Sequence, residues 1–517
     1  MSSTRREFLS ISSFALGIAS LHPKRLYSDA SKSIDKDQLA DVSLISSKRL
    51  GASYADIRIN RETSEAIFTR EHQVEDVVQS ESFGFGVRVL VKGAWGFAAN
   101  RLVTEEAVRR TTEAAVAIAR ANAAYQEQPV TLVPVKKQVA KWKSSFQKNP
   151  FEVALDQKIQ FLISLNERAL KIKGVSFIDS SLVFVQEDRF FASSEGSRIE
   201  QTLVRCHPGF NITAVDTAKG NFAERESLGG PQAIGYEYIE NYPWQQEAEE
   251  AAYEVVEKLN AKPVAPAKYD LVLHPTHLWL TIHESAGHST ELDRALGWEA
   301  DCAGTSFLTP DKKGKFQFGS KRVNFIADRI QAQGLATVGY DDDGVKAQRW
   351  YLVEDGVFVD WQTTRELAAR VGHKSSYGCC HAQNWDSVPF PRMPNVSLEP
   401  SKQNVSLEDL IADVKNGILI FGDGSFSIDQ QRYNFQFGGQ VFWEIKDGKK
   451  GVMLRDVAYQ SRTPDFWGAC DGLGGVATYE LHGSLGDGKG EPMQSNPVSH
   501  GCPVARFRQI NVLNTGT

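Results

Sequence analysis

His283-Glu284-Ser285-Ala286-Gly287-His288 is the most informative stretch of this sequence, because two imidazoles and a carboxylate lie within six residues. It follows the apolar run 269–273, which we expect to form a strand that leads into a helix. Neutral imidazoles are common zinc ligands, and a neighbouring carboxylate can take a proton from water that the metal activates. The stretch therefore predicts a metal centre with His283 and His288 as ligands and Glu284 as general base.

The spacing of the two histidines adds a structural condition. Five positions separate them, one more than in the H-E-x-x-H metallopeptidase motif. On an ideal α-helix a spacing of five places side chains about 140° apart, whereas a spacing of four places them about 40° apart. Both imidazoles can reach one metal only if the helix is bulged or broken between them, and we expect the break at Gly287. The alternative is a chance cluster in a helix that happens to contain histidine.

Length and composition indicate a globular protein of several domains. The 517 residues correspond to about three domains. Hydrophobic residues make up 41% and charged residues 24%, which is enough apolar material for substantial cores. The net charge of −6 and the lack of a basic stripe with interleaved aromatic residues give no reason to expect nucleic-acid binding. No apolar run reaches the roughly 18 residues that a membrane helix needs.

The N-terminus has the pattern of an export signal. Thr4-Arg5-Arg6-Glu7-Phe8-Leu9 is a twin-arginine sequence, an apolar stretch follows to Leu21, and Pro23-Lys24-Arg25 comes next. We expect residues 1–30 to be a twin-arginine signal that directs the chain to the periplasm, with Ser28-Asp29-Ala30 as a candidate cleavage site. Retention as a membrane tether, or a short amphipathic helix with two surface arginines, are the alternatives. The twin-arginine route carries folded proteins, which suits an enzyme that is loaded with metal before export.

The spacing of the six cysteines does not indicate a zinc site or a disulfide-bonded scaffold. They occur without C-x-x-C spacing, so neither a zinc ribbon nor a small disulfide scaffold is indicated. The pair Cys379-Cys380 beside His381 is either a metal or redox feature or, as we favour, two ordinary core or loop residues.

The chain divides into three α+β regions after the signal. We predict an N-terminal domain over 45–128, a central domain over 135–262 and a large β-rich C-terminal domain over 267–517 that carries the metal, with proline-punctuated linkers between them. In the first two domains we expect helices at Thr104–Ala123, Ala154–Lys171 and Trp244–Leu259, and strands at Tyr54–Asn60, Glu65–Thr69, Ser82–Val91, Phe177–Gln186, Asp188–Ser193 and Arg198–His207.

The C-terminal region is predicted to be rich in strands. Asp447-Gly448 lies between alternating runs and indicates a tight hairpin. The glycine-rich segment 472–490 has too little apolar pattern for a helix, so we expect long loops there. Strands are expected at Gly424–Asp429, Tyr433–Phe437, Val441–Lys446 and Val452–Val457.

Several separate motifs, in order from about residue 50 to the end, resemble the TldD/PmbA family of metallopeptidases. They are His283-Glu284-x-x-x-His288 with Glu291, Gly304-Thr305-Ser306, Thr363-Thr364-Arg365-Glu366, Pro391-Arg392-Met393-Pro394-Asn395, and the tail Gly488-Lys489-Gly490-Glu491-Pro492 through Val498-Ser499-His500-Gly501. The resemblance implies three domains, a metal in the β-rich C-terminal domain, and dimers that enclose a channel around the active site. It also implies cleavage of small or unfolded peptides. Because the TldD type has the H-E-x-x-x-H motif and the PmbA type lacks it, we expect the metal-bearing type, as a homodimer or paired with a PmbA-type subunit.

One position departs from the family. Its catalytic members supply a third zinc ligand from a cysteine directly before the Gly-Lys pair, and this sequence has Asp487 there. Two histidines and an aspartate can hold Zn²⁺, and the harder carboxylate makes Mn²⁺ or Fe²⁺ possible as well. His500, His482 and Cys502 are the other candidates for the third ligand. If Asp487 is instead a solvated turn residue, the site has lost its metal.

The residues around the motif leave further alternatives. Glu291, three positions after His288, is either a hydrogen-bond partner for that imidazole or a surface glutamate. His274 and His277 are expected to be core or supporting residues and not ligands. Two other functions stay open: a non-catalytic peptide-binding or partner subunit, and a metal-dependent amidase that acts on a non-peptide substrate. The intact His283, Glu284 and His288 argue against the first.

Overall fold

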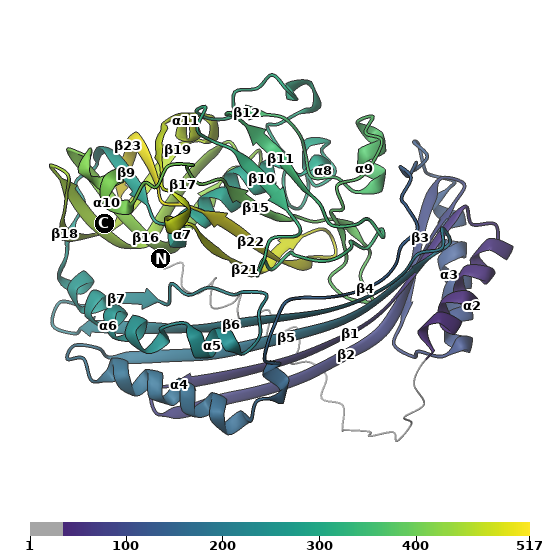
Figure 1. The fold of residues 1–517 in the computed structure, drawn as a ribbon, viewed down its shortest axis with the longest axis horizontal. Helices are drawn as coiled ribbons and strands as arrows, with labels where there is room; N and C mark the ends of the chain where they lie inside the picture. Colours follow the sequence, from purple (N-terminus) through teal and green to yellow (C-terminus); the bar gives the residue numbers. More distant parts are fainter. Residues whose placement is uncertain (1–34, 517) are drawn as a thin grey trace.

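A computed structural model describes residues 35–516 of the chain, and the predicted signal, residues 1–30, lies outside them. The fold is mixed α+β and rich in strands, as predicted: a long curved sheet holds a large C-terminal body in its curve (Figure 1). None of the helices within residues 35–516 has the length and apolar character to span a membrane.

The large sheet has seven strands in the order β3-β2-β1-β5-β6-β4, with β7 against β6. Its central pair, β1 and β5, joins the first predicted domain to the second over fifteen positions, from Asp56↔Ser193 to Arg70↔Asp179. The two strands expected between residues 54 and 69 form one long strand. The bounds are β1 Tyr54–Arg70, β2 Gln73–Val91, β3 Ala94–Asn100, β4 Val139–Lys143, β5 Phe177–Ser193, β6 Arg198–Asp216 and β7 Asn221–Glu226.

One face of this sheet is apolar and covered by helices at both ends. Ile57 and Ile59 of β1 belong to the core under α2 and α3, and Ile67 belongs to the core under α4 and α6. Because alternate strand residues point to one face, all three lie on the same side. In Figure 1, α2, α3 and α4 lie outside the curve of the sheet. The helices are α2 Lys36–Arg49, α3 Glu105–Asn122, α4 Leu155–Leu170, α5 Glu237–Asn241 and α6 Trp244–Asn260.

The opposite face of the sheet is charged and contacts the C-terminal body. Arg88 of β2 forms ion pairs with Asp56 of β1 and with Asp343 of the C-terminal body, each at 2.7 Å. Burial raises the pKa of Asp56, and the Arg88 guanidinium opposes that rise. Six buried residues that join the two parts are called the interface cluster below: Asp56, Arg88, Glu187, Arg189, Arg205 and Asp343.

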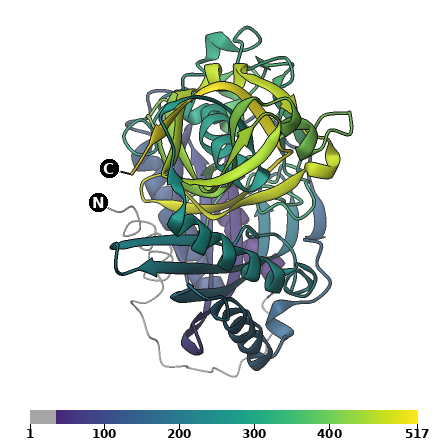
Figure 2. The same cartoon turned by 90° about the vertical axis from the view of Figure 1, so that its left-hand side faces the viewer.

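The C-terminal body is built around a closed barrel. β16 pairs with β9 on one side and with β17 on the other, which closes the order β16-β9-β23-β19-β17 into a ring (Figure 2). The predicted hairpin is present: Asp447 and Gly448 both have positive φ, as a two-residue turn between β17 and β18 requires. The strands are β8 Lys262–Pro263, β9 Ala267–Leu273, β16 Asn416–Ile428, β17 Asn434–Lys446, β18 Lys449–Arg455, β19 Val457–Arg462, β20 Cys470–Leu473 and β23 Ala505–Asn514.

Smaller sheets lie beside the barrel. The long loops predicted over 472–490 are wrong, because β21 occupies Glu480–Lys489 and pairs with β22. Its glycines and polar residues hide the alternating pattern of a strand, and the pairing comes from the backbone. The remaining strands are β10 Phe325–Asp328, β11 Arg349–Glu354, β12 Val357–Phe358, β13 Cys380–His381, β14 Phe390–Pro391, β15 Asn395–Leu398 and β22 Gln494–Cys502.

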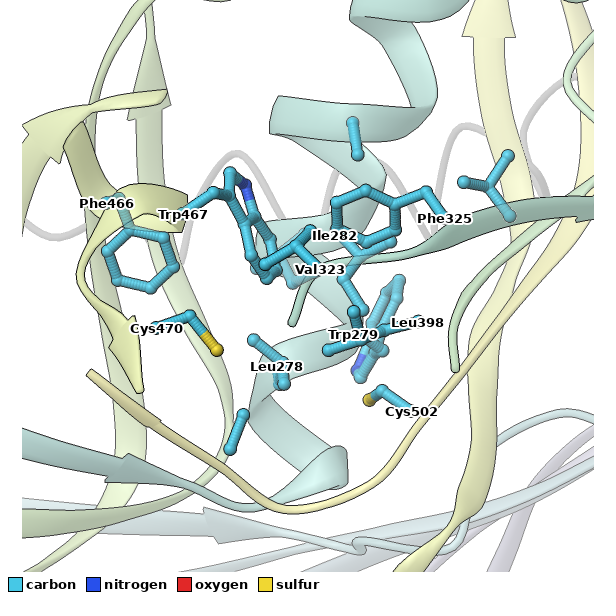
Figure 3. Packing of buried hydrophobic residues seen from close by; sticks show 14 of the residues in the cluster. Leu278, Trp279, Ile282, Val323, Phe325, Leu398, Phe466, Trp467, Cys470 and Cys502 are labelled. Atoms are coloured by element: carbon cyan, nitrogen blue, oxygen red, sulfur yellow. The ribbon is translucent and has the colours of Figure 1, made fainter. Parts of the chain in front are cut away.

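The helix before the histidine motif lies inside this body. All eight residues of α7 (Pro275–Ile282) are buried. Leu278 and Ile282 belong to the same core as Trp467 and Phe325, and Figure 3 shows these side chains packed around the helix. An apolar core thus fixes the helix that presents the motif. The other helices are α8 Leu292–Ala295, α9 Arg365–Arg370, α10 Leu407–Ala412 and α11 Thr463–Gly468.

Candidate metal centre

The two histidines are brought together by a π-helical turn. α7 passes into a π turn over His283–Gly287, in which the backbone N–H of His288 donates to the carbonyl of His283. One π turn therefore spans the five-residue spacing, and the two rings lie 4.5 Å apart between centroids. This turn is the irregularity that the spacing predicts.

Gly287 allows close packing and has an ordinary backbone angle. Its φ is −58°, an ordinary helical value. A Cβ at this position would lie 2.6 Å from Sδ and 2.9 Å from Cε of Met393. The segment between β14 and β15 thus approaches the histidine turn closely, and a side chain at position 287 would require the flexible end of Met393 to move.

Asp487 lies opposite the two imidazoles. It follows a bulge in β21, where the pairing with β22 shifts between Ser484 and Asp487. Its Oδ1 lies 3.8 Å from Nε2 of His283 and 3.6 Å from Nε2 of His288. Ligand atoms on a tetrahedral zinc ion are roughly 3.3 Å apart, so a small closure would fit the three atoms to a divalent cation. Within residues 35–516 this is the one such group of three His, Cys, Asp or Glu residues.

Hydrogen bonds fix the orientation of His283. Its Nδ1 lies 2.9 Å from Nε2 of His500, whose own Nδ1 lies 2.7 Å from the Val396 carbonyl oxygen. Because a carbonyl only accepts, His500 donates through Nδ1 and accepts at Nε2 from His283. His283 therefore turns its Nε2 lone pair towards Asp487. Burial keeps both rings neutral, since it lowers the pKa of His283 well below its usual range and that of His500 to about 4. His500 thus fixes the orientation of the His283 ring through the nitrogen that does not face Asp487.

The second imidazole is held in the same way. Nδ1 of His288 donates to Oε2 of Glu291 at 2.9 Å, which leaves Nε2 for Asp487 and a cation. Glu291 is buried, and it also binds Nζ of Lys489 at 2.8 Å and Nε of Arg294 at 2.5 Å. Burial alone would raise the pKa of Glu291, but Arg294 and Lys489 hold it well below its usual range. Glu291 is therefore a hydrogen-bond partner and not a surface residue.

The predicted general base lies beside the group and carries an ion pair. Oε2 of Glu284 is 2.7 Å from Nη1 of Arg432, at the tip of the β16–β17 hairpin. Burial raises the pKa of Glu284 to about 7, and Arg432 limits the rise. Nη2 of Arg432 also donates to the carbonyl oxygen of Ala303 at 3.1 Å.

Asp487 is anchored by a cation as well. Nη2 of Arg392 lies 3.1 Å from Oδ2 of Asp487, and Nη1 donates to the backbone oxygen of Gln494 on β22 at 2.7 Å. With 5% of its surface exposed, Asp487 is not a solvated turn residue. Eight buried or nearly buried charged residues make up what we call the metal-centre cluster: Glu284, Glu291, Asp293, Arg294, Arg392, Arg432, Asp487 and Lys489.

The other candidates for the third ligand lie outside the group. His482 pairs with Glu480 at 2.8 Å. The Cys502 thiol contacts the carbonyl oxygen of Pro275 at 3.9 Å, and it is a buried free cysteine. Cys379 and Cys380 are also buried free cysteines, and neither joins a metal-ligand group among the described residues.

His274 and His277 have structural positions. The His274 side chain caps the N-terminus of α7 by accepting from the backbone of Thr276. His277 bonds the Gly422 carbonyl oxygen and the Tyr459 hydroxyl, each at 2.9 Å. Both stabilise the helix that leads into the motif.

The four cations of the metal-centre cluster were not assigned from the sequence. Lys489 and Arg392 belong to the motifs on which the family resemblance rests, so their positions could have drawn attention to them. Arg294 lies three residues after Glu291, a spacing at which two side chains often pair. Arg432 had no such positional signal, because a separate hairpin brings it to Glu284 from 148 residues away.

Two buried imidazoles and a carboxylate are a donor set that metal-dependent hydrolases use, and the adjacent glutamate matches their general base. Sequence comparison places the chain in a known group of proteins. Models of PmbA/TldA metallopeptidase domain 1, central domain and C-terminal domain match residues 55–119, 148–262 and 266–514. The chain belongs to the TldD/PmbA family of metallopeptidases.

Individual relatives agree with this assignment. A metalloprotease of Methanocaldococcus jannaschii is 30% identical over 456 residues, which cover 88% of this chain and 95% of that protein. A zinc metalloprotease TldD homolog of Saccharolobus solfataricus is 22% identical over 471 residues, 90% of this chain and 97% of the relative. The crystal structure of TldE from Thermococcus kodakarensis has the same fold, with a TM-score of 0.71 and 15% identity over 92% of this chain and 99% of that one.

Proposed function

We propose that this protein is a TldD-type metal-dependent peptidase that hydrolyses small or unfolded peptides. The observation that supports it best is the convergence of His283 Nε2, His288 Nε2 and Asp487 Oδ1 next to Glu284. Each imidazole is fixed by a hydrogen bond on its other nitrogen, so the donor set is organised before any cation binds. A divalent cation held by these three residues would polarise the scissile carbonyl and lower the pKa of the attacking water.

The side chains of the chain itself account for the proton transfers. Glu284 accepts a proton from the attacking water and then delivers it to the leaving amine. A pKa raised by burial to about 7 suits a group that must both take and give a proton near neutral pH. Arg432 remains charged throughout and holds one oxygen of Glu284.

Zn²⁺ is the cation that we propose first. Two imidazoles and one carboxylate are a usual donor set for catalytic zinc, and one relative is named a zinc metalloprotease. Asp487 in place of a thiolate makes the set harder, so Mn²⁺ or Fe²⁺ would also be accepted.

The shape of the site favours extended substrates. His283, His288 and Asp487 keep only 8%, 4% and 5% of their surface exposed. Because so little of these groups is exposed, we expect an extended chain or a small peptide to reach them more readily than the surface of a folded protein. For the same reason we prefer peptides to bulky conjugates as substrates.

We propose that the chain works as a dimer, either with itself or with a PmbA-type subunit. The resemblance to the TldD/PmbA family supports it, and both a TldD-type and a TldE-type chain are among the proteins that this chain is similar to. Light scattering of the purified protein, alone and mixed with a PmbA-type chain from the same source, would distinguish the two forms. A monomer under both conditions would contradict the proposal.

We also propose export to the periplasm through the twin-arginine pathway, on the pattern around Arg5 and Arg6. Fractionation of cells that produce the full chain should place it in the periplasm. Substitution of both arginines by lysine should retain it in the cytoplasm. Equal distribution of the two forms would contradict export by this route.

The test of the activity is Glu284→Gln. After reconstitution with Zn²⁺, this variant should keep one equivalent of metal and lose about 10²- to 10⁴-fold in turnover of a fluorogenic peptide library. Asp487→Ala should lose the metal itself, and chelation should abolish wild-type turnover. Glu480→Gln changes a carboxylate outside the ligand group and should stay within about twofold of wild type. Full activity of Glu284→Gln would refute the mechanism, and a wild-type protein that binds no metal would favour the binding-subunit alternative.

A further inference from the structure

Arg432 occupies a backbone position that suits glycine or asparagine better than arginine. It lies in the turn between β16 and β17 with φ of 64°, in the left-handed region. Asp429 closes this turn by accepting from the backbone of Arg432, Tyr433 and Asn434. A left-handed conformation costs an L-residue roughly 1–2 kcal/mol. Lys92 adopts the same backbone conformation in an exposed hairpin, so the backbone alone assigns no role to Arg432, and the contacts of its side chain are what distinguish it.

The contacts of the guanidinium indicate what the role is. Nη1 binds Oε2 of Glu284 at 2.7 Å, and Nη2 binds the Ala303 carbonyl oxygen at 3.1 Å. Two anchors define the position of the guanidinium, which in turn holds one carboxylate oxygen. Within the described part of the chain Oε1 of Glu284 has no hydrogen-bond partner, so it is the oxygen left for the attacking water.

Arg432 also differs from the other cations of the metal-centre cluster. The side chains of Arg294, Arg392 and Lys489 are no more than 1% exposed, and they bind the carboxylates that hold or form the ligand set. The side chain of Arg432 is 15% exposed and binds the only carboxylate of the cluster that we assign to proton transfer. Its position depends on the hairpin and not on the histidine helix.

We propose that Arg432 is a positioning residue for catalysis: it fixes Oε2 of Glu284 so that Oε1 faces the attacking water. This inference rests on the proposed peptidase function. Because arginine does not lose its proton and binds through a rigid fork, the positioning does not change between the two proton transfers. The ligand set is held by other residues, so metal binding does not depend on Arg432.

Arg432→Gly tests this role, because glycine accepts the left-handed turn without strain. With Zn²⁺ and a fluorogenic peptide library, kcat should fall about 10- to 100-fold while KM changes less than threefold. The dissociation constant for Zn²⁺ should stay within about twofold. Added methylguanidinium should restore part of kcat, and Arg432→Lys should fall between the two. The matched control is Lys92→Gly, an exposed hairpin residue with φ of 51°, which should leave every value unchanged.

A second measurement separates positioning from other roles. In a Glu284→Gln background, Arg432→Gly should change the residual kcat by less than about twofold, because no carboxylate remains to be positioned. A rise in KM with kcat unchanged would overturn the inference in favour of substrate binding. Weaker Zn²⁺ binding in Arg432→Gly would overturn it in favour of a structural role. Unchanged kcat in an active enzyme would refute the inference alone, whereas a zinc-loaded wild type without turnover would refute the peptidase function and the inference with it.

Discussion

Arg88 of the interface cluster lies between the carboxylates of Asp56 and Asp343, 2.7 Å from each. Lys489 of the metal-centre cluster lies between Glu291 and Asp293 at 2.8 and 2.7 Å. Both cations are buried and each neutralises two buried carboxylates. In charge and burial the two arrangements are close to equivalent, and they lie in different parts of the molecule.

The two clusters differ in the other groups that their charged side chains contact. In the interface cluster, Arg88 and Arg205 donate to the backbone carbonyl oxygens of Asp342 and Leu335. Arg189 contacts Nδ1 of His381, so all three cations join the sheet to the C-terminal body.

In the metal-centre cluster, Glu291 also accepts a hydrogen bond from Nδ1 of His288, and Arg392 donates one to Asp487. Buried ion pairs add little net stability compared with apolar packing. In the candidate metal centre their contribution is the orientation of the ligand atoms, and substitutions can separate this orientation from stability.

The largest expected effect is common to both clusters. Arg88→Met removes the cation that Asp56 and Asp343 share, and Lys489→Met removes it from Asp293 and leaves Glu291 with Arg294 alone. Each substitution should therefore destabilise the metal-free protein by about 3–5 kcal/mol. Denaturant unfolding of the two variants measures this. Only Lys489→Met should also weaken Zn²⁺ binding. An equal loss of metal affinity in Arg88→Met would mean that the two clusters are not functionally distinct.

A smaller change should act on the metal alone. Glu291→Gln keeps the shape of the side chain but removes the charge that orients His288, so Zn²⁺ affinity should fall about 10- to 100-fold. Competition with a chromophoric chelator gives the affinity. Asp56→Asn makes the matching change in the interface cluster and should leave Zn²⁺ affinity unchanged. An unaltered affinity in Glu291→Gln would show that the imidazole needs no charged partner.

The packing of the histidine turn gives a third comparison. Gly287→Ala would place Cβ against the flexible end of Met393, and we expect a loss of about 1 kcal/mol in unfolding free energy. In a Met393→Ala background the same substitution should cost less, because the space is then open. Thermal unfolding of the four proteins measures the coupling. Additive effects would mean that Met393 is not the neighbour that excludes a side chain.

The smallest effect is expected at an exposed ion pair, and it is the reference for the losses expected at buried ones. Glu106 and Arg110 form an exposed pair one turn apart on α3. Glu106→Gln should change the unfolding free energy by less than about 0.5 kcal/mol, since water and salt screen such pairs. A change above 1 kcal/mol, measured by the same denaturant titration, would call into question the assignment of the larger losses to burial.

Much of the site could be predicted because its chemistry is local. His283, Glu284 and His288 stand in one short stretch, and their five-residue spacing already required an irregular helix. Asp487 came from the family pattern, and the geometry brings it to the two imidazoles. Arg432 could not be predicted, because its contact with Glu284 depends on how the β16–β17 hairpin folds over the motif.

The sequence was sufficient to predict the fold class and some of the individual strands and helices. Alternation revealed the long strands of the first sheet, but no local pattern shows that β1 and β5 pair across two predicted domains. The strand β21 was missed for a different reason. Asp487 and Lys489 contribute polar side chains to the candidate metal centre, and the strand pairs with β22 through its backbone. It therefore lacks the apolar alternation that identifies a strand.

The π turn at His283–Gly287 has a consequence for the length of the motif. A π turn holds one residue more than the α-helical turn that it replaces. Deletion of Ser285 or Ala286 would leave a regular helix with the histidines four positions apart, about 40° from each other around the axis. A single-residue insertion or deletion is thus enough to interconvert the H-E-x-x-x-H and H-E-x-x-H spacings with both imidazoles still on one side of the helix.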